Sequence, residues 1–106
     1  MTRGTTPTYT FKMSMAKDTI KDIWITFKQE MKIEEDRTLT KSMSDGSVTY
    51  DGTEVSLTLT QQETLDFKEG VPIEIQGKVL TTLNKVIPTD IKKEGCSRIL
   101  NEEVMQ

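Results

Sequence analysis

Alternation of apolar and polar residues is the dominant pattern along the chain. Between residues 9 and 15 every second side chain is aromatic or Met, and the next segment repeats this spacing with Ile23, Ile25 and Phe27. A period of two residues is the spacing of a β-strand that has one buried face. The same alternation places Trp24 on the opposite face of its strand, away from the predicted core.

Further segments show strand spacing after this point. We expect strands over residues 29–33, 37–43, 47–50, 53–60 and 71–80, a short strand ending at Pro88, and a strand in the first half of the tail that begins at residue 91. The charged residues around 29–33 would also suit a short helical turn. The strand over residues 37–43 is expected to be an edge strand. Lys41 lies in its buried-side row, and inward-pointing charges protect sheet edges.

The alternation breaks at Thr60. Thr60 and Glu63 have the spacing of a capping box, in which the Thr side chain caps the first helical turn and the Glu side chain reaches back. Leu65 and Phe67 follow and are expected to fold over the core. The sequence therefore predicts one short helical turn near residues 60–66, which is a corner between two strands and not a ligand site.

Short strands separated by turns are typical of an antiparallel β-sandwich. Two Asp-Gly pairs, at residues 45–46 and 51–52, supply the positive φ angles that tight hairpin turns need. We predict an all-β fold, in which residues 1–106 form a single sandwich domain of about seven to nine strands. A small barrel is the alternative. Residues 1–8 carry Gly, Pro and four Thr, and are expected to form a flexible N-terminal arm.

Charge and composition narrow the range of partners. The chain has 106 residues, with 17 acidic and 14 basic side chains spread along it and a net charge of −3. No basic stripe is present, so no nucleic-acid partner is expected. No apolar run is long enough to span a bilayer and no segment is both basic and amphipathic, so no membrane partner is expected. The N-terminus lacks the apolar region of a secretory signal, which favours synthesis and assembly in the cytoplasm.

Residue types that carry chemistry are scarce. Histidine is absent, which removes the commonest general base and metal ligand. Cys96 is the only cysteine, and we expect a small buried or half-buried thiol near a terminal strand rather than a disulfide or a metal site. The six glycines form no phosphate-binding loop. We therefore expect a non-enzymatic protein with no catalytic residue, no cofactor and no metal.

Trp24 is the one candidate site residue. It is the only tryptophan in the chain, and its strand spacing turns it toward solvent or toward a partner. Exposed aromatic side chains are enriched among the residues that dominate binding at protein interfaces. The alternative is a structural role, in which the indole lies over outer-face aliphatic groups such as the stem of Lys28, or under the N-terminal arm.

Several fragments occur in an order that resembles a group of small prophage proteins of Gram-positive bacteria. The fragments are "RGTTPTYTF", "DIWITFKQ", "VSLTLTQQETLDF", "IEIQGKV" and "LNEEVM", which together span almost the whole chain. The sandwich pattern is also similar to the immunoglobulin-like N-terminal domain of phage baseplate upper proteins. This resemblance implies an immunoglobulin-like sandwich with no catalytic residues. It also implies a tail- or baseplate-associated structural protein that resides in the host cytoplasm during assembly, and in the virion if the phage is complete.

The resemblance implies that the partners are other phage structural proteins and further copies of the chain. Pairing of a sheet edge with a partner strand is one mode that would serve such contacts. A carbohydrate- or cell-surface-binding module is the alternative function, and it would require Trp24 to act together with Tyr9 or Tyr50. A regulator of a host enzyme is a third possibility that composition leaves open.

Overall fold

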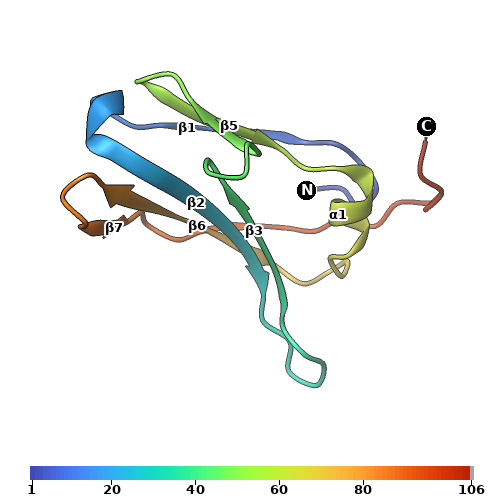
Figure 1. The fold of residues 1–106 in the computed structure, drawn as a ribbon. Coiled ribbons are helices and arrows are strands. Elements are labelled where there is room, and N and C mark those ends of the chain that lie inside the picture. Colours follow the sequence, from blue (N-terminus) through green and yellow to red (C-terminus); the bar gives the residue numbers. More distant parts are fainter. Residues whose placement is uncertain (106) are drawn as a thin grey trace.

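Two antiparallel β-sheets pack face to face in the computed structural model, which describes residues 1–105 (Figure 1). The smaller sheet has the order β1-β5-β4, formed by Thr8–Lys12, Glu54–Thr58 and Val48–Tyr50. The larger sheet has the order β3-β2-β6-β7, formed by Arg37–Ser42, Ile20–Gln29, Ile73–Thr81 and Val86–Pro88, and β8 (Lys92–Glu94) pairs with the first half of β6. A 3-10 turn, η1 (Lys17–Thr19), leads into β2.

The predicted all-β sandwich is confirmed, and the eight strands found within residues 1–105 lie in the predicted range. Their pairing order is that of an immunoglobulin-like sandwich. In that scheme β1, β5 and β4 take the places of strands B, E and D, while β3, β2, β6 and β7 take those of C′, C, F and G. No strand of the described residues occupies the place of strand A, beside β1.

The apolar rows predicted from the alternation form the core between the sheets. Ile23, Ile25 and Phe27 of β2 are buried, as are the inward residues of β5 and β6. The ring of Tyr9 on β1 packs edge-on against Phe27, with 5.2 Å between the ring centroids. Because both sheets contribute to this one cluster, burial of its side chains is the main force that holds the two layers together.

The helical corner is confirmed as α1 (Gln61–Leu65), which joins β5 of the smaller sheet to β6 of the larger. Thr60 Oγ1 accepts a hydrogen bond from Glu63 N at 3.1 Å, and Thr60 N donates to Glu63 Oε1 at 2.8 Å. Both halves of the predicted capping box are therefore present. Phe67, just after the helix, is buried, as expected.

The strand expected over residues 29–33 is wrong. β2 ends at Gln29, and the residues after it form the loop to β3. The Gln29 side chain is fully buried: its Nε2 donates to the carbonyls of Lys68 (2.8 Å) and Val71 (2.9 Å), and its Oε1 accepts from Lys68 N (2.7 Å). This amide ties the end of β2 to the loop before β6. Ile33, beyond it, is 98% exposed and faces no core.

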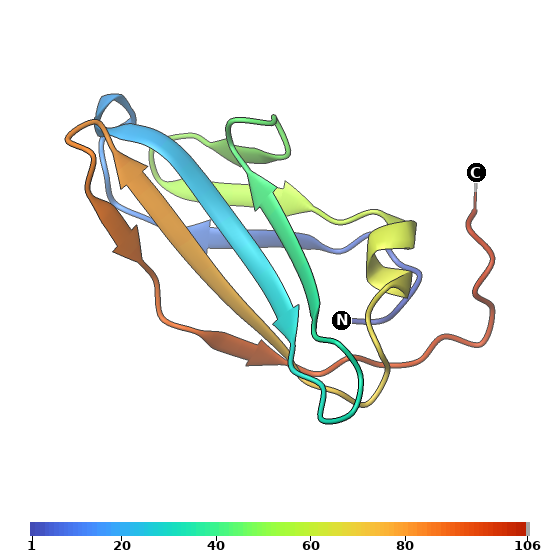
Figure 2. The ribbon, with the colours of Figure 1, turned by 60° about the horizontal axis from the view of Figure 1, so that its bottom comes forward.

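The first residues of the chain lie against α1 and the C-terminal segment, whereas the sequence predicted a flexible arm over residues 1–8 (Figure 2). Thr2 forms an isolated parallel bridge with Ser97. Thr5 N donates to Thr64 Oγ1 at 3.1 Å, and this hydroxyl donates back to the Thr5 carbonyl at 2.9 Å. Backbone groups of this segment thus form hydrogen bonds within the same domain, which a free arm would not do.

Candidate functional site

Trp24 lies on the outer face of the larger sheet, as the alternation predicted, with 48% of its surface exposed. It stands on β2, in register with Lys78 of β6. Neither the stem of Lys28 nor the first residues of the chain line the hollow in which it sits. The indole is therefore available at the surface of the domain.

Asp22 holds the indole in place. Trp24 Nε1 donates to Asp22 Oδ2 at 2.7 Å, while Asp22 Oδ1 accepts from the backbone N–H groups of Ile23 (2.8 Å) and Ser44 (3.0 Å). Burial by itself would raise the pKa of Asp22, but the hydrogen bonds from Trp24, Ser44 and Ile23 outweigh it and lower the pKa. The carboxylate therefore stays charged at neutral pH and continues to accept the indole N–H.

Three adjacent strands complete a surface that we call the Trp24 patch. A hollow of about 230 Å³ is lined by Asp22, Trp24, Lys78, Leu80 and Val86. The pairing register explains this grouping, because β2 aligns Asp22 with Leu80, and β7 aligns Val86 with Leu80. An exposed aromatic ring beside aliphatic groups, with one anion and one cation at the border, has the composition of a protein-docking surface.

Leu80 and Val86 were missed by the sequence analysis. Both lie in segments whose strand character was predicted, but their place beside Trp24 depends on the pairing of β2 with β6. These two strands are separated by three other strands along the chain. No local signal in the sequence indicates such a pairing, so only the register of the sheet brings the patch together.

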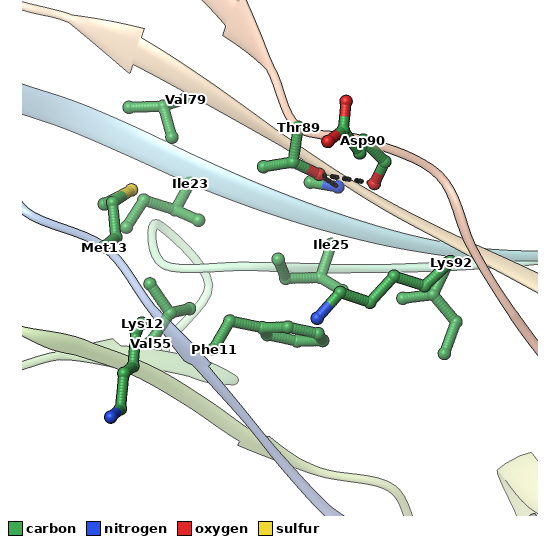
Figure 3. Close-up of a pocket in the computed structure, with 12 residues that line it drawn as sticks. Phe11, Lys12, Met13, Ile23, Ile25, Val55, Val79, Thr89, Asp90 and Lys92 are labelled. Atoms are coloured by element: carbon green, nitrogen blue, oxygen red, sulfur yellow. Dashed lines mark hydrogen bonds between the residues drawn. The ribbon is translucent and has the colours of Figure 1, made fainter.

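A second candidate surface lies where β1 forms the edge of the smaller sheet (Figure 3). A cleft of about 260 Å³ opens there between the sheets, and most of its lining side chains are apolar. Phe11 of β1 forms part of its floor, and the ammonium of Lys92 lies 5.4 Å from the centroid of the Phe11 ring, a cation–π distance. On the opposite wall, Thr89 Oγ1 accepts from Gly77 N at 2.8 Å.

The two tyrosines do not join Trp24. Tyr9 packs in the interior against Phe27, and its hydroxyl donates to Glu94 Oε1 at 2.9 Å. Tyr50 is buried, and its hydroxyl accepts from Met15 N at 3.2 Å. The platform of neighbouring aromatic side chains that the carbohydrate-binding alternative requires is therefore not formed by these residues.

The remaining reactive groups are held in structural positions. Cys96 is buried near the last strand, as expected, and burial raises the pKa of its thiol. Burial and the hydrogen bond to Glu94 likewise raise the pKa of the Tyr9 hydroxyl. Across residues 1–105, no three His, Cys, Asp or Glu side chains are grouped so as to hold a metal ion. In the same range, no helix has the length and apolar character needed to cross a membrane.

Comparison with known proteins adds no relative. No protein-family model, curated protein or solved structure matches the chain. The function must therefore be argued from the two surfaces described above.

Proposed function

We propose that the chain is a non-enzymatic structural protein of phage origin, associated with a tail or baseplate, which acts by binding other phage structural proteins. The observation that carries the binding role is the Trp24 patch: an exposed indole, fixed by Asp22, next to Leu80 and Val86. The phage assignment is supported by the resemblance of the ordered sequence fragments and by the immunoglobulin-like sandwich.

The fixed indole favours binding for an energetic reason. A tryptophan that is free to rotate loses side-chain entropy when a partner immobilises it, at a cost of about 0.5–1.5 kcal/mol for a rotamer-rich side chain. The hydrogen bond to Asp22 orders the ring before any partner arrives. When a partner buries the exposed ring, less of the free energy gained is therefore lost to ordering this side chain.

Mass spectrometry of purified particles tests this proposal. Prophage induction in the source bacterium, followed by gradient purification of the particles, should yield this chain in stoichiometric proportion to known tail proteins. Cross-linking of the same particles would then identify its neighbours. If capsid and tail proteins are abundant and the chain is missing, the virion role is wrong, and a binder of a host protein becomes the better interpretation.

A further inference from the structure

β1 exposes one row of backbone hydrogen-bonding groups. The odd-numbered residues of β1 make the backbone hydrogen bonds to β5. Met13 continues this pattern, because its backbone N–H donates to the Thr53 carbonyl at 2.9 Å. Successive residues of a strand direct their N–H and C=O groups to opposite edges. The groups of Thr8, Thr10 and Lys12 therefore point away from β5, where no strand of the described residues meets them.

The cleft between the sheets opens beside this row (Figure 3). Phe11 and Met13 line it from the β1 side, and Ile25 and Val79 line it from the larger sheet. The larger sheet continues beyond β1, since Ile87 of β7 pairs with Val79 on the inner face and is still 44% exposed. The space over β7 and β8, beside β1, is the place of strand A in an immunoglobulin-like sandwich.

The other sheet edges are less suited to accept a strand. β4 has three residues, which is too short to hold an added strand well. On β3, Lys41 points inward and forms an ion pair with Glu63 of α1 at 2.5 Å, so a charged pair and not an apolar wall borders the inner side of that edge. The edge formed by β7 and β8 contains Pro88 and is interrupted at Thr89, whose backbone N–H donates to the Gly77 carbonyl while its hydroxyl accepts from Gly77 N.

A second copy of this chain does not fit symmetrically on the β1 edge. Antiparallel pairing of two β1 strands requires a two-fold axis perpendicular to the sheet, and this axis places both inner faces on the same side. Because the larger sheet extends past β1 in each copy, the two overhanging sheets would occupy the same space. The occupant must therefore be a single extended segment that brings no second layer with it.

The charges around the cleft define the composition of that segment. Its lining residues include two cations, Lys12 and Lys92, and one anion, Asp90. The side chains that a new strand turns toward the cleft would meet its apolar walls, with the ammonium of Lys92 over the Phe11 ring, and the side chains between them would lie on the outer face beside Lys12, which points away from the cleft (Figure 3). We propose that the edge of β1 binds one extended partner segment in which aliphatic residues alternate with carboxylates. This proposal rests on the proposed function, because it assigns a surface to its protein contacts.

Backbone amide exchange, measured by NMR on the full chain, tests the strand addition. The probe is an acetylated and amidated peptide in which valine and glutamate alternate over about seven residues. We expect the peptide to slow exchange at Thr8, Thr10 and Lys12 by about tenfold or more, and to leave Tyr9 and Phe11 unchanged, because β5 already protects them. A peptide with lysine in place of glutamate should bind about tenfold more weakly. Absence of the alternating protection, or equal binding of both peptides, would overturn the proposal.

A proline substitution supplies the matched control. Thr10→Pro removes an N–H group that faces away from β5, so the ladder within the sheet is kept while the new pairing is lost. Thr40→Pro makes the same change on the free edge of β3. Only Thr10→Pro should weaken peptide binding, by about tenfold. If Thr10→Pro does not fold, the exchange pattern of the unmodified chain decides alone. A chain that is present in particles but does not bind the peptide would refute the strand addition and leave the proposed function standing.

Discussion

The indole nitrogen of Trp24 and the carboxylate of Asp22, two residues apart on the outer face of β2, are joined by a hydrogen bond of 2.7 Å. The same carboxylate also accepts backbone N–H groups from β2 and from the loop after β3. The orientation of the exposed ring is therefore coupled to the structure of that loop. A partner that binds the ring meets a surface whose shape is set by the fold.

Replacement of Trp24 by lysine should weaken assembly without unfolding the domain. The side chain is about half exposed and lies outside the core, so its loss, with that of the hydrogen bond to Asp22, should lower the free energy of unfolding by only about 1 kcal/mol. Association can be followed by light scattering and by incorporation into particles. Thr26→Lys is the control, since it adds the same charge to the same face outside the Trp24 patch. Unchanged assembly in Trp24→Lys would remove the interface role of the patch.

Acid should release the indole from Asp22. The folded pKa of Asp22 lies below its ordinary value of 3.8, so the stability that this carboxylate contributes is present above pH 3.8 and is lost as the pH falls through the folded pKa. Fluorescence of the single tryptophan should report the transition, because the charged acceptor next to the ring disappears. Asp22→Asn should show no such titration. A transition of the same midpoint in that variant would assign it to another group.

Substitution of Gln29 should reveal a buried polar anchor. Gln29→Met removes three hydrogen bonds and leaves backbone groups of Lys68 and Val71 without these partners, at an expected cost of about 2–4 kcal/mol in urea unfolding. Gln29→Glu should cost more at pH 7, because a carboxylate would face two carbonyl oxygens. The pKa of that glutamate should be raised, so its penalty relative to the unmodified chain should shrink at acid pH. A penalty independent of pH would contradict this arrangement.

The ion pair between Lys41 and Glu63 should couple β3 to α1. Both side chains are largely shielded, with 14% and 21% of their surfaces exposed. A double-mutant cycle with Lys41→Met and Glu63→Gln, in which the glutamine can keep the capping box, should give a coupling of about 1 kcal/mol at pH 7. Burial would raise the pKa of Glu63, but hydrogen bonds from Lys41 and Thr60 lower it, so the coupling should vanish as the pH falls well below 4.5. Additive effects at neutral pH would show that the pair is energetically silent.

Local patterns in the sequence account for most of the fold. Alternation predicted which face of β2, β5 and β6 is buried, and the Thr60–Glu63 spacing predicted α1. The segment after Gln29 was mistaken for a strand because its apolar residues alternate too. At the end of β2, the Gln29 amide instead binds a loop some forty residues further along the chain. A contact between residues so far apart cannot be predicted from the local alternation.

The candidate site could be predicted only in part. The outward direction of Trp24 follows from the period of the strand alone. The neighbours that turn one exposed ring into a patch, Leu80 and Val86, are supplied by non-local pairing. The free edge of β1 could not be predicted either. A strand has a free edge only when no other strand pairs with its second side, and this depends on the whole topology.

The order of the strands also has a consequence for the time the chain needs to fold. The connections β1 to β2, β3 to β4 and β5 to β6 each cross from one sheet to the other, so the local hairpins leave both sheets incomplete. The ladders of β1 with β5 and of β2 with β6 must close long loops before the core can form. Loop closure of this kind is slow, and we expect folding on the millisecond-to-second scale of other sandwiches rather than in microseconds.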